Sequence, residues 1–222
     1  MSVERNFLVR AKDVRAYLRS LLELETKLLM PGRGFYRAAE TVTVSRASAF
    51  IMMYNIVEYA VREAILEIRS DIANHAGNFG LLLDHWKQEI IDAHFYERMQ
   101  QGTNHKSLLM DVVAFMPGKI SWENNLNKLP FPGNVDHKEL IRFVKKIDYS
   151  WKPPKGCLGG SDLELVRQMR NDLAHGLETF STVGSQYTTQ DMIDKFDRVR
   201  KVLLSFIRMV ERYKARQLYL ER

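Results

Sequence analysis

Apolar residues recur every three or four positions along most of the chain, which is the spacing of one buried face of an α-helix. The segments that carry this pattern are residues 3–29, 42–73, 78–101, 136–148 and about 190–220. The stripe of the last segment consists of Phe196, Val199, Leu203, Phe206, Val210 and Tyr213. Its alternating steps of three and four are those of a helix-bundle seam. The pattern predicts an all-α bundle of four to five main helices.

Two stretches lack this periodicity. Residues 102–135 contain Pro117-Gly118, Asn124-Asn125, Pro130 and Pro132-Gly133, which predicts an irregular insertion. Strands or short helical turns near Met110–Phe115 are equally compatible with the pattern. The insertion could cover an active site, hold a ligand, or simply pack on the bundle. Residues 178–188 are polar and are predicted to form a loop before Thr189 caps the last helix.

A shorter helix is predicted from Ser161, because Ser161 and Glu164 have the spacing of a capping box. Its apolar side comprises Leu163, Val166, Met169 or Arg170, Leu173 and Leu177. The same helix carries Arg170, whose planar cation suits phosphate, and it ends near His175, which can move protons close to neutral pH. A cation and a proton carrier are the minimum set for cutting RNA without a metal, since the 2′-hydroxyl can be the nucleophile.

The helical spacing leaves the geometry of this pair open. At about 100° per residue, Arg170 lies about 140° around the helix from His175. Arginine's length could bridge the gap, the helix could loosen near Gly176, or two copies of the motif could meet at one phosphate. A two-fold dimer would supply one His175 as acid and one as base. In the non-catalytic alternative, Arg170 pairs with Asp172 or Glu164 and His175 caps the helix end.

The segment Arg170-Asn171-Asp172-Leu173-Ala174-His175-Gly176 resembles the R-x4-6-H signature of the HEPN superfamily, many of whose members are metal-independent RNases of toxin–antitoxin and phage-defence loci. Two further segments resemble a prokaryotic HEPN-like nuclease family: Tyr54-Asn55-Ile56-Val57-Glu58 and Gly133-Asn134-Val135-Asp136. With the final helix, the resemblance covers about residues 45–215. It implies a HEPN-like bundle with Arg170 and His175 as the catalytic pair.

The resemblance also suggests supporting residues. Asn171 would fix the motif by hydrogen bonding, and Asp172 would tune His175 or face solvent. Asn55, Glu58 and Arg62 share one polar stripe of the 42–73 helix. This stripe either faces the motif helix and orients the catalytic pair, or it holds a Glu58–Arg62 surface ion pair.

The activity implied is an endoribonuclease that leaves 2′,3′-cyclic phosphate and 5′-hydroxyl ends, acting as a toxin or phage-defence effector. Its expected partners are RNA, a second copy that completes the active site, and an antitoxin or ATPase protein. The alternative is a non-catalytic HEPN-like module that binds RNA, a nucleotide or a partner protein in a defence complex.

Composition adds limits to this interpretation. The 222 residues suit a single HEPN-like domain, 1–222, and the net charge of +6 favours an anionic partner such as RNA. The densest basic surface is predicted on the last helix, either to track a phosphate backbone or to keep the protein in solution. Cys157 is the only cysteine and no H-E-x-x-H occurs, so no metal site or cofactor is expected. No apolar run approaches about 18 residues and the start lacks a signal-peptide core, which predicts a cytoplasmic protein without membrane spans.

Overall fold

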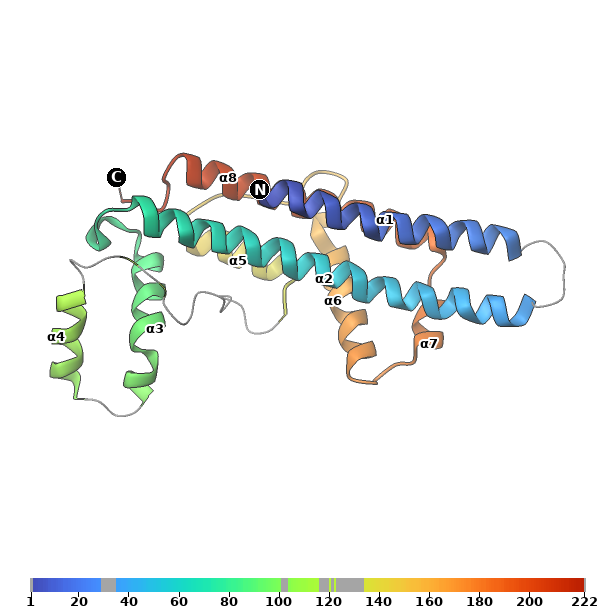
Figure 1. Ribbon diagram of the computed structural model, residues 1–222, viewed down its shortest axis with the longest axis horizontal. Helices are drawn as coiled ribbons and strands as arrows, with labels where there is room; N and C mark the ends of the chain where they lie inside the picture. The colour runs from blue at the N-terminus through green and yellow to red at the C-terminus, as the bar shows by residue number, and fades with distance from the viewer. Residues whose placement is uncertain are drawn as a thin grey trace. The chain divides into compact units, whose positions relative to one another are not determined.

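The computed structural model describes residues 2–28, 35–100, 104–115, 120, 122 and 134–221 (Figure 1). Its α-helices are α1 (Val3–Leu28), α2 (Phe35–His75), α3 (Asp84–Gln100), α4 (His105–Phe115), α5 (His137–Lys146), α6 (Ser161–Ala174), α7 (Phe180–Ser185) and α8 (Thr189–Ala215). Short 3₁₀ helices, η1 (Phe79–Leu81) and η3 (Leu158–Gly160), precede α3 and α6. The described residues contain no strand, and only the isolated bridge between Leu82 and Leu220 has β-type pairing. The all-α prediction is confirmed.

The predicted apolar stripes form the core. Phe7, Ala11, Val14, Leu18 and Leu21 of α1 are buried, as are all six seam residues of α8. On α2 the buried stripe is Phe50, Tyr54, Val57, Val61, Ala64 and Ile68, and on α5 it is Leu140, Phe143 and Val144. Burial of these faces is the main source of helix stability, because an isolated helix is marginal in water.

Several predicted boundaries were wrong. Helix α2 begins at Phe35, seven residues before the predicted start, and the segment that precedes α3 is a 3₁₀ turn rather than α-helix. The supposed loop 178–188 contains α7, and the insertion 102–135 contains α4. The rest of that insertion lies outside the described residues, apart from Asn104, Ile120, Trp122 and the stretch that begins at Asn134.

Contacts divide the chain into two compact units. Unit 1 comprises Met1–Val61, Gly133–Leu140 and Lys152–Ile207, and unit 2 comprises Arg62–Pro132, Ile141–Trp151 and Arg208–Arg222. The single domain expected from the sequence stays a prediction. Within the described parts of both units, no helix is long and apolar enough to cross a membrane.

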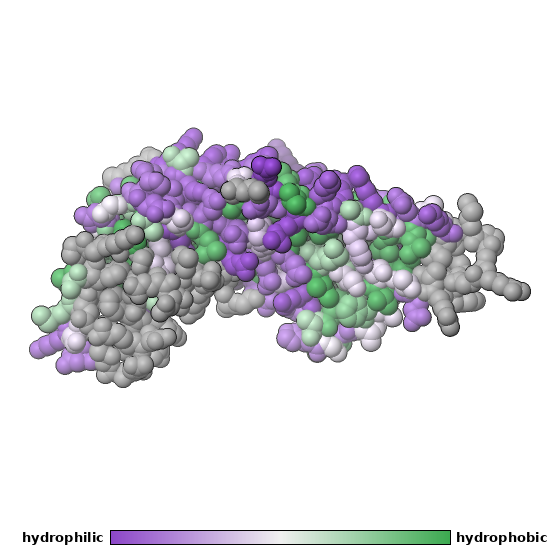
Figure 2. Space-filling model, in the orientation of Figure 1, coloured by the Kyte–Doolittle hydropathy of each residue, from purple (hydrophilic) through white to green (hydrophobic). Residues whose placement is uncertain are grey.

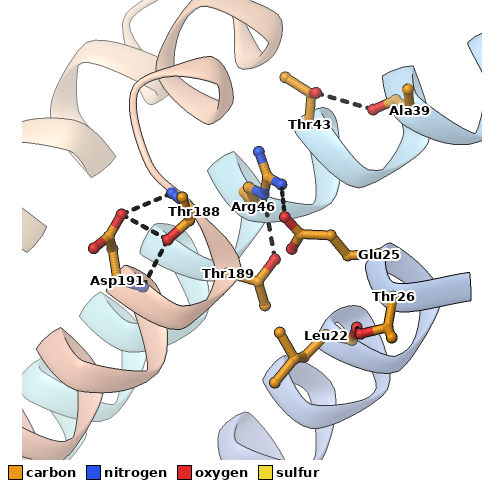
Figure 3. Close-up of polar contacts among 9 residues, drawn as sticks. All are labelled: Leu22, Glu25, Thr26, Ala39, Thr43, Arg46, Thr188, Thr189 and Asp191. Atoms are coloured by element: carbon orange, nitrogen blue, oxygen red, sulfur yellow. Dashed lines mark hydrogen bonds and ion pairs between the residues drawn. The ribbon is translucent and has the colours of Figure 1, made fainter. Parts of the chain in front are cut away.

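In unit 1, Arg46 of α2 joins three helices (Figure 3). Its guanidinium pairs with Glu25 of α1 and donates to the Thr189 hydroxyl of α8 at 3.2 Å. The sequence predicted Thr189 as the N-cap of α8, but Thr188 forms the cap. Thr188 and Asp191 exchange backbone and side-chain hydrogen bonds of 2.7–3.1 Å, a reciprocal capping box. Thr189 is instead buried against Arg46.

Helix α7 lies very close to α2. A Cβ atom added at Gly184 would stand 1.8 Å from the carbonyl oxygen of Thr43. Gly184 is therefore required by space and not by backbone conformation. On the face shown in Figure 2, hydrophilic side chains predominate along α1, where Arg5, Lys12 and Arg19 are exposed.

Unit 2 has a core of aromatic and paired polar side chains. The Trp86 indole donates to the Tyr213 hydroxyl at 3.0 Å, and Glu89 accepts from Arg69 at 2.7 Å and from the Trp122 indole at 3.0 Å. Trp122 belongs to the insertion and is buried. This part of the insertion thus packs as core of unit 2.

Candidate functional site

Helix α6 begins differently from the prediction. Ser161 is its first helical residue and the N-cap is Gly160, at φ +91° and without a side-chain cap. The left-handed backbone suits glycine, and a Cβ atom there would also stand 2.8 Å from the Cβ atom of His137. Glu164 is consequently free of the capping role and pairs with Lys138 at 2.7 Å. The predicted capping box of Ser161 and Glu164 was wrong, but the predicted helix is present.

The second residue of α6 ties the helix to α8. Asp162 is buried and accepts from Arg198 at 2.5 Å, with Lys195 at 3.8 Å. The pKa of Arg198 is raised, chiefly by this hydrogen bond. Because Asp162 is buried and paired, it fixes the position of the motif helix at its N-terminal end.

The C-terminal end of α6 is a Schellman turn. The Leu177 N–H donates to the carbonyl of Asp172 at 2.8 Å, the Gly176 N–H donates to that of Leu173 at 3.4 Å, and Gly176 has φ +67°. The helix therefore stops at Ala174, and His175 is its C-cap at φ −92°, ψ 0°. This is the helix end near Gly176 that the sequence left as one option. Leu177 is 72% exposed, so its predicted place on the apolar side was wrong.

Arg170 lies over a buried tyrosine. Its guanidinium carbon stands 4.8 Å from the ring centre of Tyr54, and Nη1 donates to the Asn171 side chain at 2.9 Å. A cation over an aromatic face is attracted by the ring quadrupole. Neither predicted ion pair of Arg170, with Asp172 or with Glu164, is formed. Among the described residues, the Nε and Nη2 donors of Arg170 have no partner, and they are free to bind an anion.

Asn171 connects Arg170 to a distant segment. Its amide nitrogen donates to the Asn134 side-chain oxygen at 3.2 Å. The neighbouring Val135 N–H donates to the Tyr54 hydroxyl at 3.1 Å. The contacts thus form a closed ring from Arg170 through Asn171, Asn134 and Val135 to Tyr54 and back. This ring limits the motion of the guanidinium.

The same surroundings raise the pKa of the Tyr54 hydroxyl. Burial is the main cause that raises its pKa, and the charge and hydrogen bonding of Glu58 raise it further, while the Val135 N–H and Arg170 act in the opposite direction. Tyr54 therefore stays neutral near pH 7 and serves as an apolar face with one anchored hydroxyl.

The other predicted site residues differ in their surroundings. Glu58 is half-buried beside Tyr54, and Arg62 pairs with Glu63 at 3.4 Å rather than with Glu58. Asn55 and His175 are exposed, and no side-chain partner stands near either among the described residues. Asp172 contributes its carbonyl to the helix end. The structure thus places Arg170 and Asn171 in contact, with Glu58 beside the same tyrosine. The His175 imidazole is exposed to solvent.

Two residues of this arrangement were missed by the residue analysis. Tyr54 and Asn134 both lie in segments that carried the family resemblance, which was the one available signal. Their partners are 81 and 37 residues away in sequence, so no local spacing reveals the contacts.

Part of the basic surface predicted on α8 is occupied by ion pairs. Arg198 pairs with Asp162, Arg200 lies 3.9 Å from Asp197, and Lys214 pairs with Glu67. Lys201, Arg212 and Arg216 are exposed, and a phosphate-tracking role of this surface stays a prediction. In the described part of the chain, no three His, Cys, Asp or Glu side chains are grouped to hold a metal ion.

Comparison with known proteins identifies the family of the chain. The RiboL-PSP-HEPN family model matches residues 13–212, which include Tyr54, Asn134 and the whole Arg170–His175 motif. Searches of curated proteins and of solved structures find no match. The family match covers most of the chain, and the chain therefore belongs to the RiboL-PSP-HEPN family.

Proposed function

We propose that this protein is a metal-independent endoribonuclease in which Arg170 and His175 act on the scissile phosphate. The observation that carries the proposal is the state of Arg170, whose guanidinium is held by Tyr54 and Asn171 while Nε and Nη2 have no partner among the described residues. The exposed His175 five residues later supports it. Membership of a HEPN family fits an RNase or an RNA-binding role.

The chemistry needs only these side chains and the RNA. Arg170 binds the phosphate and stabilises the charge that develops on its oxygens. An imidazole takes the proton of the 2′-hydroxyl, whose oxygen attacks phosphorus and forms a 2′,3′-cyclic phosphate. The P–O5′ bond breaks, and a second imidazole protonates the leaving oxygen to give a 5′-hydroxyl. Each chain offers one His175, so we place the reaction in a homodimer with a composite site.

In the cell we propose a role as toxin or phage-defence effector, with RNA as substrate and an antitoxin or ATPase protein as regulator. A cytoplasmic location belongs to the same proposal. One observation favours the alternative of a non-catalytic binding module: among the described residues, His175 has no carboxylate beside it to orient its ring.

The test is RNA cleavage in EDTA by the purified full chain, compared with Arg170→Ala and His175→Ala. His75→Ala is the matched control, because His75 is also an exposed histidine at the end of a helix. We expect the wild type and the control to produce fragments with cyclic phosphate ends, and both motif variants to lose at least about a hundred-fold in rate.

The outcomes separate the two functions. Cleavage that disappears in EDTA and returns with magnesium would exclude the metal-independent mechanism. Equal cleavage by all variants would remove the motif from the active site. If no protein cuts RNA but the wild type retains it on a filter and Arg170→Ala does not, the binding module is the correct function.

A further inference from the structure

The ring of contacts around Arg170 contains two side chains whose roles the motif does not define. Tyr54 is fully buried on α2, and Asn134 is half-buried before α5. Neither belongs to the R-x4-H motif. Both nevertheless determine where the guanidinium can lie, one through its ring face and the other through Asn171.

We propose that Tyr54 and Asn134 are positioning residues that hold Arg170 in the phosphate-binding orientation before RNA arrives. This inference rests on the proposed function. An arginine side chain has many rotamers, and ordering it at the moment of binding costs free energy. A guanidinium already fixed against a ring and an amide avoids most of that cost.

The geometry explains why two holders are needed. The guanidinium carbon lies 4.8 Å from the Tyr54 ring centre, and this contact limits movement of the cation away from the ring but does not by itself fix which donors point outward. The bond from Nη1 to Asn171 fixes the direction of the fork, and Asn171 in turn donates to the Asn134 oxygen. The donors left over, Nε and Nη2, lie on one edge of the fork, which suits bidentate contact with a phosphate.

The first measurement is the order of the Arg170 side chain, read from ¹⁵N relaxation at Nε in the free full-length protein. The resonance is identified by its absence in Arg170→Lys. We expect Arg170 to be as rigid as the helix backbone in the wild type. In Asn134→Ala and in Tyr54→Leu it should become as mobile as the exposed Arg5. Asn134→Asp keeps an oxygen acceptor for Asn171 and should restore the rigidity.

The second measurement is the cleavage kinetics of the same variants. We expect Asn134→Ala to lower kcat by roughly ten- to hundred-fold with little change in KM, and Asn134→Asp to recover most of that loss. Asn74→Ala is the matched control, since Asn74 also has a side-chain hydrogen bond, to Ser70 at 3.5 Å, and lies in unit 2. It should keep the wild-type kcat. Unfolding curves confirm that each variant is folded.

The two measurements distinguish failure of the inference from failure of the function. If Arg170 stays rigid in Asn134→Ala, the positioning role is wrong. It is also wrong if that variant keeps the wild-type kcat while Arg170→Ala is inactive, and in that case the nuclease function stands. If the wild type does not cleave RNA, the proposed function and the catalytic role of these residues fail together. Restored rigidity with restored kcat in Asn134→Asp would establish the inference.

Discussion

At the scale of single residues, the buried hydroxyl of Tyr54 has a stability role separate from that of its ring. It accepts the Val135 N–H at 3.1 Å in the interior of unit 1. A buried N–H that loses its acceptor has no water to replace it. The residue therefore serves both the fold and the site through different atoms.

Tyr54→Phe tests this division. We expect it to lower the free energy of unfolding by about 1–3 kcal/mol, since the Val135 N–H is left unpaired while the ring beneath Arg170 remains. Urea unfolding measures the change. Tyr59→Phe is the control, because the described residues offer no hydrogen bond to its hydroxyl, and it should stay within about 0.5 kcal/mol of the wild type. Equal stability of the two variants would contradict the prediction.

Sequence reasoning placed Arg170, Asn171 and His175 near the end of one helix, as the structure has them, because their spacing is local. Their role as one site stays a prediction. It could not supply Tyr54 or Asn134, whose contacts join segments far apart in the chain. It predicted Ser161 as the N-cap of α6, but the N-cap is Gly160. The left-handed backbone of Gly160 cannot be predicted from the pattern of side chains.

At the scale of secondary-structure elements, the close approach of α7 to α2 is the most demanding contact of unit 1. The carbonyl of Thr43 occupies the space where any side chain of residue 184 would begin. The short helix α7 therefore sits where it does because residue 184 has no side chain.

Gly184→Ala should displace α7 from α2. Overpacking of a tight contact costs about 1–3 kcal/mol and sometimes more, and the obstacle here is backbone at 1.8 Å, so we expect at least about 3 kcal/mol. The melting temperature and urea midpoint report it. Ser181→Ala, at an exposed position of the same helix, is expected to leave both unchanged. A Gly184→Ala protein as stable as this control would show that α2 and α7 separate at little cost.

The long helices were predictable because a stripe of buried residues repeats along each of them. Among the short helices, the 10-residue α5 was predicted from its apolar stripe, but α4 and α7 were not. Helix α7 spans 6 residues, too few for a periodic signal, and the pattern around α4 was equally compatible with strands. A glycine such as Gly184 usually indicates the end of a helix, but in α7 it permits the close contact with Thr43.

At the scale of the whole molecule, a composite site predicts that an inactive subunit lowers the activity of an active one. If one phosphate needs two imidazoles, a mixed dimer of wild type and His175→Ala has only one. After subunit exchange with an excess of this variant, activity should fall well below that of wild type diluted to the same extent in buffer. Activity equal to simple dilution would mean that each chain works alone.

The pH dependence of stability should be steepened by His85 in unit 2. Burial is the main cause that lowers its pKa, and the charges of Lys146 and Arg69 add to this, against Glu89. The Nε2 atom of His85 and a Glu89 oxygen are 3.6 Å apart, which is too long for a hydrogen bond that would compensate. As pH falls from about 6.5 toward the lowered folded pKa, the unfolded chain binds a proton that the folded protein does not, so stability is lost.

Urea unfolding at pH 7.5 and pH 5.5 checks this sign. We expect the wild type to lose more stability between the two conditions than His85→Gln, in which the titrating group is absent. The comparison uses the difference within each protein, so any packing cost of the substitution cancels. Parallel losses in the two proteins would exclude His85 as a contributor.

The long sequence separations within the Arg170 site also have a consequence for synthesis. Tyr54 binds Val135, which is 81 residues later in the chain, and Asn134 binds Asn171, which is 37 residues later. At about 5–20 residues per second, roughly 10–30 s pass before the ribosome has made the motif helix. Until then the nascent chain lacks Arg170 and His175, and it carries both Tyr54 and Asn134 only after residue 134 has been added. The contacts that hold Arg170 can therefore form only late in translation, after the motif helix has been synthesised.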